Sequence, residues 1–488
     1  MGILLISYLR PRALSGLVVV GIGSVLGGCQ SYERAPLDII SHRSTVENRI
    51  KTTEPIDAFL DRLTESGNRT PEHFDPNDGL SVAEGEVLAL FYNADLRLAR
   101  LTANVPLANY ETAGLWEDPV FGFDGAEVLS SASPFEYGLT LGLTIPISGR
   151  LGVAKDRAGA AYAAELKRIV DAEWTTRSRV KSAWATWAVA ETRVHLLSEM
   201  IEQIEQIGLI TDRLEEAGEL AHVEARLLRA ELLQAHVRQA QAEFTATQAR
   251  VNLLGLLGLS PTSDIDLIAS LEINEMTSSE DELGRLIESN TLLAVRRAEY
   301  QIAEETLRLE IRKQYPDITI GGGYGSEDKD DRLLLGLSIP IPIFNANRSG
   351  IAQAKVKRDI ARTMAEMTFE QLAREIAMTN TAILAFESQL LTFETELVPM
   401  LDRQFQDMEQ LIDLGEIDIL TLLETVSRRF DAKNQLLNLR LALLNAMIER
   451  ARLLGPDKPR APAPVDNIPN QTSHRAETIP SLPKEGSR

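Results

Sequence analysis

The side chains best suited to chemistry are few in this chain, and their spacing does not indicate catalysis. The six histidines are His42, His73, His195, His222, His236 and His474. None of them stands at a metal-ligand spacing from a neighbouring Cys, His or Glu. The sequence also lacks the phosphate-binding Gly-Lys-Ser/Thr loop, a nucleophile-elbow serine and the dinucleotide-binding glycine fingerprint. We therefore predict a protein that is not an enzyme and that holds no metal or other resident cofactor.

Cys29, the single cysteine, is placed for covalent lipid attachment. Two arginines precede an apolar run over 13–25, and Leu-Gly-Gly at 26–28 comes directly before the cysteine. A basic segment, an apolar segment and a small-residue cleavage site make up a signal peptide, and the arrangement resembles a bacterial lipobox. Cleavage would leave Cys29 at the new amino terminus with a diacylglycerol and an N-acyl lipid, and Gln30 fits sorting to the outer membrane. The alternative is an ordinary signal peptide in which Cys29 is incidental.

Composition narrows the class of protein further. The chain has 488 residues, of which 44% are hydrophobic and 25% charged, enough apolar material for a large folded core. Its formal net charge of −21 and the lack of a basic patch argue against nucleic acid as a partner. Long stretches rich in Ala, Leu, Glu, Arg and Gln predict long helices. No apolar run after residue 29 reaches the roughly 18 residues of a transmembrane helix, so a membrane crossing would require β-strands closed into a barrel.

The two halves of the chain carry the same landmarks in the same order. The first-half landmarks are Asn93, 141–147 (LGLTIPI) and Gly218-Glu219, and their second-half counterparts are Asn290, 335–341 (LGLSIPI) and Gly415-Glu416. The separation between counterparts is nearly constant, which indicates an internal duplication.

Each copy is expected to form a helix, two strands, a very long helix, a sharp turn and another long helix. In the first copy these are the helix 82–112, the strands 118–127 and 135–147, and the helices 151–216 and 221–257. In the second copy they are the helix 282–313, the strands 317–324 and 333–341, and the helices 351–414 and 418–454. The strands alternate apolar and polar residues, and the second strand of each pair has about ten residues, the length of a tilted membrane strand. An amphipathic hairpin on a soluble core would show the same alternation.

Four strands are too few to enclose a lumen, because membrane barrels begin at about eight strands. The chain is therefore expected to oligomerise, and by count alone either two or three copies would serve.

Together these features resemble the TolC-like family of outer-membrane efflux proteins over residues 80–454. The resemblance implies a mainly α fold with a transmembrane β part: a homotrimer in which each chain gives four strands to a 12-stranded outer-membrane barrel, continued by a long periplasmic α-helical barrel. It implies a channel of a tripartite efflux or type I secretion system, which passively exports substrate from an inner-membrane pump and a periplasmic adaptor. The rival interpretation is a periplasmic adaptor or an envelope coiled-coil scaffold lipoprotein, and neither explains the duplicated strand pairs.

The resemblance also assigns roles to the two helix-joining turns. The turn residues implied to meet the adaptor are Gly218, Glu219, Leu220, Gly415, Glu416 and Ile417. The residues implied at the entrance constriction are Glu224, Thr421 and Glu424, where only one of the usual acidic positions of the second copy is kept. A structural role competes with these assignments, since glycines cap helix C-termini and carboxylates complement a helix N-terminus.

The resulting domain plan has six parts. They are a lipoprotein signal peptide (1–28), a lipid anchor with linker and N-terminal segment (29–79), the first repeat (80–257), an equatorial connector (258–281), the second repeat (282–454) and a Pro-rich tail expected to be disordered (455–488). The substrate, whether drug, metal cation or polypeptide, stays open.

Overall fold

The computed structural model forms two compact units, one up to Asn48 and one from Arg49 onward. It describes residues 32–65, 71, 74–127, 135–271, 281–327, 330–413, 419–457 and 462–463. The first unit contains α2 (Ile39–Glu47), whose N-terminus is capped by the Asp38 carboxylate accepting the Ser41 N–H at 3.0 Å. Cys29 and the second-copy turn residues Gly415, Glu416 and Ile417 lie outside the described residues.

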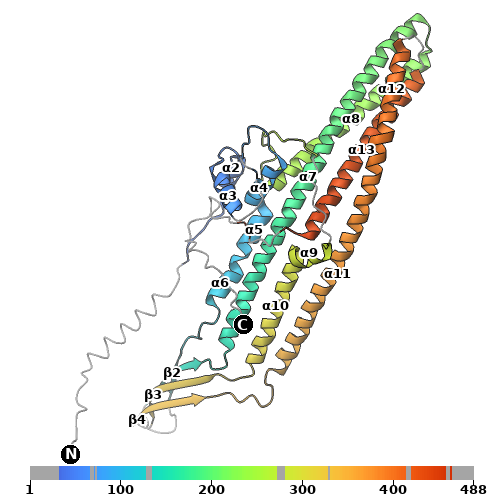
Figure 1. Ribbon diagram of the computed structural model, residues 1–488. Helices are drawn as coiled ribbons and strands as arrows, with labels where there is room; N and C mark the ends of the chain where they lie inside the picture. Colours follow the sequence, from blue (N-terminus) through green and yellow to red (C-terminus); the bar gives the residue numbers. More distant parts are fainter. Residues whose placement is uncertain are drawn as a thin grey trace, which may run out of the picture. The chain divides into compact units, whose positions relative to one another are not determined.

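The second unit repeats one order of elements (Figure 1). After α3 (Glu54–Glu65), the first copy consists of α4 (Val82–Tyr92), α5 (Ala94–Thr102), α6 (Asn104–Thr112), β1 (Val120–Ala126), β2 (Glu136–Ile145), α7 (Arg150–Ala217) and α8 (His222–Leu257). The second consists of α9 (Glu282–Ser289), α10 (Thr291–Arg312), β3 (Ile318–Glu327), β4 (Asp330–Ser338), α11 (Arg348–Thr392), the π-helical turn η1 (Phe393–Leu397), α12 (Val398–Asp413) and α13 (Ile419–Leu454). Within the described part of the chain, no helix is long and apolar enough to cross a membrane.

The prediction of one continuous helix at the start of each copy was wrong, because an asparagine divides that helix. Asn93 starts α5 by accepting the Leu96 N–H at 3.2 Å, and Asn290 starts α10 by accepting the Leu293 N–H at 2.7 Å. A second break, at Ala103, separates α5 from α6.

Each asparagine also holds the far end of its own repeat. The Asn93 amide donates to the Leu256 carbonyl at 2.9 Å, and the Asn290 amide donates to the Leu453 carbonyl at 2.7 Å. One side chain therefore satisfies a helix N-terminus and a helix C-terminus together, which is why the break is needed for the repeat to close.

The prediction of one helix over 351–414 was also wrong, since η1 interrupts it just before Pro399. Proline has no N–H to donate to the carbonyl four residues earlier. The helix instead accommodates one extra residue in this turn, so that the Val398 N–H donates to the Phe393 carbonyl, five residues earlier. The corresponding helix of the first copy, α7, is continuous over 68 residues.

The strands of the two copies join into one antiparallel sheet in the order β1-β2-β3-β4. Its centre is the pairing of β2 with β3, in which Leu143 faces Ile320 and Thr144 faces Thr319. The observed strands differ from the predicted ones at their ends: β3 extends to Glu327, and β4 ends at Ser338, before Pro340. In the sheet as described, β1 and β4 each have one strand neighbour and therefore one free edge.

The helices of the second unit pack side by side in an open row (Figure 1). Next to the sheet, α5 and α6 pack on α7, α7 packs on α10, and α10 packs on α11. Towards the turn after α7, α8 packs on α7, α7 packs on α13, and α13 packs on α11 and α12. One edge of the row is thus α5, α6 and α8, and the other is α11 with α12.

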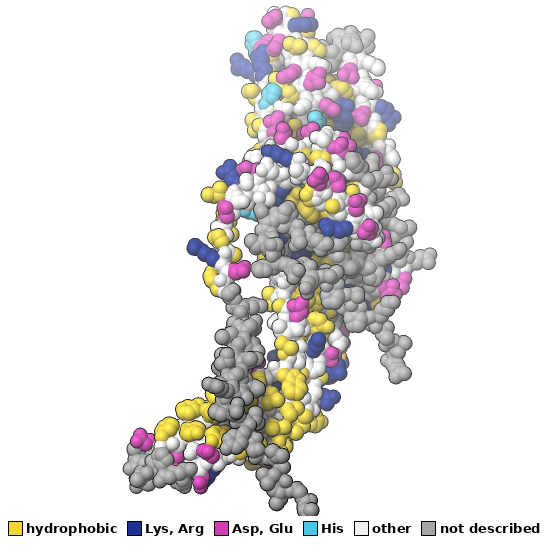
Figure 2. All heavy atoms as spheres, turned by 90° about the vertical axis from the view of Figure 1, so that its left-hand side faces the viewer, with side chains coloured by type: hydrophobic (Ala, Val, Ile, Leu, Met, Phe, Trp, Pro, Cys, Tyr) yellow, Lys and Arg dark blue, Asp and Glu magenta, His cyan; other side chains and the backbone are white. Residues whose placement is uncertain are grey.

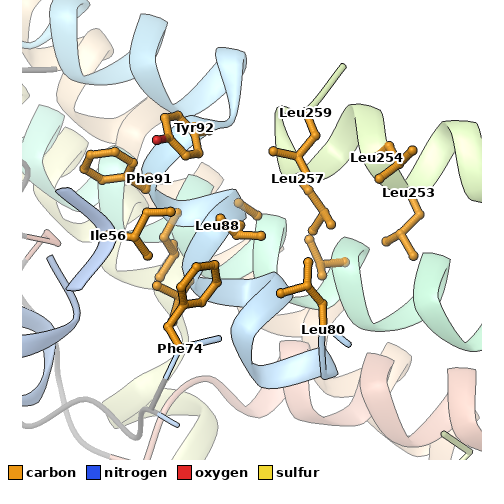
Figure 3. Close-up of a cluster of buried hydrophobic side chains, with 14 of the residues drawn as sticks. Ile56, Phe74, Leu80, Leu88, Phe91, Tyr92, Leu253, Leu254, Leu257 and Leu259 are labelled. Atoms are coloured by element: carbon orange, nitrogen blue, oxygen red, sulfur yellow. The ribbon is translucent and has the colours of Figure 1, made fainter. Parts of the chain in front are cut away.

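The main hydrophobic core lies at the middle of the row, where α3 packs on α4 and α4 packs on α7 and α8. Figure 3 shows Ile56 and Phe91 on one side of α4 and Leu254 and Leu257 on the other. Trp184 of α7 is fully buried in this core, and its indole N–H donates to the Ile268 carbonyl at 2.9 Å. Burial of these large side chains stabilises the packing of α3 on α4 and of α4 on the row.

Two described residues of the C-terminal segment, Pro462 and Ala463, lie near this core, and the prediction of a disordered tail over 455–488 stays a prediction. The Ala463 N–H donates to Glu173 Oε2 at 3.0 Å, and Arg100 Nη2 lies 2.7 Å from Glu173 Oε1. Glu173 is buried, and a buried carboxylate requires such partners. Ala463 therefore lies beside α7, at the level where α13 ends.

Candidate functional site

The sheet has one apolar face and one face of small and polar residues. In the pleat, residues paired across strands share a face, and one row of pairs runs Phe123, Leu139, Tyr324, Leu333. The apolar side chains on this face are Phe121, Phe123, Tyr137, Leu139, Leu141, Leu143, Ile145, Ile318, Ile320, Tyr324, Leu333, Leu335 and Leu337, and Gly125, Gly322, Ser326 and Asp331 lie on the same face. Leu335 is 85% exposed, and a contiguous exposed apolar surface of this kind marks an interaction site.

The opposite face has little side-chain bulk. Its residues are Val120, Gly122, Asp124, Ala126, Glu136, Gly138, Thr140, Gly142, Thr144, Thr319, Gly321, Gly323, Gly325, Glu327, Asp330, Arg332, Leu334, Gly336 and Ser338. The end of this face furthest from the helices forms a hollow whose lining includes Asp124, Glu136, Glu327 and Arg332, and Arg332 is paired with Glu327. Figure 2 shows hydrophobic side chains gathered at the sheet end of the second unit. Acidic side chains lie at the end of the sheet furthest from the helices.

The junction between sheet and helices is held by ion pairs and left-handed residues. Arg150, the first residue of α7, places Nε 2.6 Å from Asp317 Oδ2 and Nη2 2.8 Å from Glu117 Oε1. In the second copy the Asn347 amide donates to Glu310 Oε2 at 2.7 Å. Gly149 (φ 70°) and Asn347 (φ 51°) occupy the left-handed region just before α7 and α11. In both copies, therefore, a left-handed residue stands directly before the long helix that follows the strands.

Sequence analysis did not identify these junction residues. The signal that could have revealed them is a repeated pair, Gly149-Arg150 and Asn347-Arg348, placed shortly after the Ile-Pro-Ile of each copy. Gly and Asn are the residues that tolerate the left-handed region best.

The tip of the first hairpin is a capped turn. Gly218 adopts φ 79°, its N–H donates to the Glu215 carbonyl at 3.0 Å, and the Glu219 N–H donates to the Leu214 carbonyl at 2.9 Å. This pattern ends a helix by satisfying its last carbonyls, as the structural alternative predicted. Glu219 is exposed and Leu220 is half-buried on the turn.

Charged and polar side chains tie the two helices of this tip together. His222 Nδ1 lies 2.5 Å from Glu215 Oε1, and Arg229 Nη2 lies 2.6 Å from Glu215 Oε2 and 2.7 Å from Asp212 Oδ1. The hydrogen bond with His222, followed by that with Arg229, holds the pKa of Glu215 below its ordinary value. Arg229 therefore compensates the charges of Asp212 and Glu215 beside the turn.

The three residues assigned to the entrance constriction have different surroundings. Glu224 lies in the first turn of α8, where its carboxylate accepts the Ala221 N–H at 3.4 Å. Glu424 is exposed in α13, and its Oε1 lies 2.5 Å from Arg428 Nη2. Thr421 is exposed on the same helix. In the single chain, Glu224 thus complements a helix N-terminus, and the charge of Glu424 is compensated by Arg428.

The duplicated architecture matches a known family. The sequence model described as "Outer membrane efflux protein" matches residues 88–259 and again residues 283–456, together well over half of the chain. The chain belongs to the outer membrane efflux protein family. The two matches coincide with the two structural repeats, so the predicted family resemblance is confirmed.

Relatives and solved structures agree with this membership. The cobalt-zinc-cadmium resistance protein CzcC of Cupriavidus metallidurans is 22% identical over 281 residues, which are 57% of this chain and 67% of CzcC. The CusC transmembrane channel structure has a TM-score of 0.66 at 17% identity and covers 80% of this chain and 94% of its own. The open-state outer membrane channel MtrE of Neisseria gonorrhoeae also has a TM-score of 0.66 at 17% identity and covers 81% of this chain and 98% of its own.

Membership confirms several predictions. This efflux protein is not an enzyme, it is a protein of the outer membrane, and its mainly α fold with a β part is that of the solved channels. The lipid on Cys29 and the residues of the adaptor contact and constriction remain predictions.

Proposed function

We propose that three copies of this efflux protein assemble into a channel across the outer membrane. The observation that carries the proposal is the four-stranded sheet, which as described has a mainly apolar face and free edges at β1 and β4. Four strands cannot enclose a lumen, whereas three copies would supply twelve, within the range of known barrels. The apolar face would meet lipid, and the glycine- and threonine-rich face would line the lumen. The helical row would continue the wall into the periplasm.

The channel supplies no energy of its own in this proposal. A periplasmic adaptor would bind the helix tips, including Gly218, Glu219 and Leu220, and an inner-membrane pump would deliver the substrate. The exposed Glu219 and the open space around Gly218, where an added Cβ would meet nothing within 4 Å, support a tip free for a partner. A lipid on Cys29 would anchor the mature chain beside its own barrel.

Cations are the substrate class that the proposal favours. The relative CzcC is named for resistance to cobalt, zinc and cadmium, and the chain carries a net charge of −21. Among the described residues, a lumen mouth with Asp124, Glu136, Glu327 and Asp330 against Arg332 would raise the local concentration of cations.

Single-channel conductance of the purified protein in planar bilayers tests the proposal. The comparison is wild type, Glu224→Gln and Glu219→Gln, where Glu219 is an exposed turn carboxylate that serves as the matched control. Cation-selective steps support the channel, and weaker selectivity in Glu224→Gln alone supports a constriction at Glu224. Steps that both variants leave unchanged keep the channel and remove the Glu224 assignment. A folded oligomer that never conducts, under conditions that open the entrance, would favour the adaptor interpretation instead.

A further inference from the structure

We infer that the apolar face of the sheet ends in a contact site for the sugar headgroup of a glycolipid. The site, termed the rim site, consists of Phe135, Tyr137, Tyr324 and Asp331. It lies at the end of the sheet furthest from the helices, and in Figure 1 this is the end of β3 and β4 that points away from the long helices. The inference rests on the proposed channel, whose helices continue into the periplasm, and it adds a lipid partner to that channel.

The apolar face changes in character along the strands. The two levels nearest the helices carry aliphatic side chains, among them Leu143, Ile145 and Ile320. The level furthest from the helices is different, and its residues are Gly125, Tyr137, Ser326 and Asp331. Phe135 directly precedes β2 and, two residues before Tyr137, continues the alternation on the same face. Aromatic and polar groups are thus gathered where the aliphatic side chains stop.

The aromatic rings of the rim site lie together and keep exposed surface. The ring centroids of Tyr137 and Tyr324 are 6.5 Å apart, and the ring planes are tilted by 53°. The Phe135 ring lies over Gly125, where an added Cβ would be 2.6 Å from the Cζ atom of Phe135. Phe135 is 55% exposed and Tyr324 is 43% exposed. A glycine covered by an aromatic ring from the next strand is a known way of stabilising a sheet, and here it leaves the rings as one platform.

Asp331 places a carboxylate beside this platform. The Tyr324 hydroxyl is hydrogen-bonded to the Asp331 carboxylate and to the Tyr137 hydroxyl. A carboxylate offers about four lone-pair sites, so the bond from Tyr324 leaves acceptor capacity for a ligand. Asp331 is exposed, and an ionised carboxylate is costly in hydrocarbon. This level of the face is therefore suited to headgroups rather than to acyl chains.

The height of the rim site agrees with that assignment. Ile147, which is 59% exposed, follows Tyr137 by ten residues. That separation is about 34 Å along an extended chain at about 3.4 Å per residue, or about 26 Å along the membrane normal at a strand tilt of about 40°. The apolar band of outer-membrane barrels is about 25 Å tall. With Ile147 at the periplasmic boundary of the hydrocarbon, the rim site lies at the outer boundary.

A sugar ring fits the rim site better than the other parts of a lipid. The C–H groups of a sugar ring can pack on exposed aromatic faces, and its hydroxyls can donate to the Asp331 carboxylate in charge-assisted hydrogen bonds. Acyl chains would leave the carboxylate without donors, and a phosphate group would be repelled by its charge. Tyr137 and Tyr324 stand on β2 and β3, which have strand neighbours on both sides. Their rings therefore stay on the lipid-facing surface however the sheet edges are paired.

Lipid retention by the purified protein tests the rim site. The full-length protein would be reconstituted in nanodiscs of phosphatidylethanolamine and rough lipopolysaccharide, extracted in mild detergent and weighed by native mass spectrometry. Wild type should retain the lipopolysaccharide several-fold better than the phospholipid. Asp331→Asn and Tyr324→Phe should each lower this preference several-fold, because the first removes the charged acceptor and the second removes the hydroxyl bonded to it. The matched control is Asp330→Asn, an adjacent exposed carboxylate on the opposite face of the sheet.

The outcomes separate the rim site from the channel. Loss of the preference in both rim variants and not in Asp330→Asn supports the rim site. An unchanged preference in the rim variants, or an equal loss in Asp330→Asn, overturns it. Release of both lipids alike by Tyr324→Phe also overturns it, since that result indicates ordinary interfacial anchoring. Cation-selective steps in planar bilayers would keep the proposed channel in either case, and a protein that forms no oligomer would remove both.

Thermal unfolding gives a second measurement that needs no count of bound lipid. A ligand that binds only the folded protein raises its midpoint temperature. Added lipopolysaccharide should therefore raise the midpoint of wild type and of Asp330→Asn more than that of Asp331→Asn, relative to phospholipid alone. Equal rises in all three proteins would refute the rim site.

Discussion

Two crowded helix-ending glycines should be far more sensitive to substitution than a third in open space. Gly218 at the tip and Gly258 and Gly455 at the middle of the row all adopt the left-handed region, with φ of 79°, 74° and 78°. A Cβ on Gly258 would lie 2.5 Å from the Tyr92 carbonyl oxygen, and a Cβ on Gly455 would meet the Ser289 carbonyl even more closely.

Two contributions set the expected loss in the free energy of unfolding: the backbone conformation of the residue and the crowding around its new Cβ. Alanine in the left-handed region costs about 1–2 kcal/mol, and this term applies to all three sites. Forcing a methyl group against a backbone atom adds about 1–3 kcal/mol, and this term applies only to Gly258 and Gly455. We therefore expect Gly218→Ala to lower the free energy of unfolding by about 1 kcal/mol, and each of the other two by about 3 kcal/mol.

Urea unfolding of the detergent-solubilised protein, followed by circular dichroism, measures these differences as shifts in the midpoint at constant slope. Gly218→Ala is the built-in control, because it shares the conformation without the crowding. Equal losses at all three glycines would refute the role of close approach. A large loss at Gly258 with none at Gly455 would refute the structural equivalence of the two repeats.

Two further predictions concern Asn290, which links the two ends of the second repeat, and the Glu215–His222 pair at the turn after α7. Asn290→Ala removes both a helix cap and the bond to the buried Leu453 carbonyl, so it should lower the free energy of unfolding by about 2–4 kcal/mol in the same urea assay. The exposed Asn109→Ala should stay within about 0.5 kcal/mol, and a similar loss there would contradict the assignment. Because the pKa of Glu215 is lowered chiefly by His222, the stabilisation from its carboxylate should be present at neutral pH and lost as pH falls through that depressed pKa. His222→Ala should raise the pKa of Glu215 towards its ordinary value in a carboxyl NMR titration, and an unchanged value would remove this pairing.

Periodicity was enough to predict the repeated order of helices and strands. Strands with alternate apolar residues, such as 135–147, indicate a two-faced sheet whatever their neighbours, because side chains alternate along any strand. Gly218 was likewise predictable as a helix cap, since the left-handed region favours glycine wherever it occurs. Local patterns of this kind depend on backbone geometry alone. The family resemblance rested on their combination.

Long-range contacts decided the rest. That β2 would pair with β3, joining Thr144 to Thr319 by a hydrogen bond of 3.2 Å between their hydroxyls, depends on residues far apart in the chain. The helix breaks at Asn93 and Asn290 depend on the carbonyls that those side chains reach. The charge state of the tip depends on which partners the helices bring to each carboxylate.

The sequence by itself therefore determined the duplication, the periodic faces and the helix-ending glycine at Gly218, because these are properties of neighbouring residues. Only the tertiary structure determined which sheet edges have no strand neighbour among the described residues, and which carboxylates Arg229 reaches across the turn after α7. Those features depend on distances through space, which local sequence patterns do not specify.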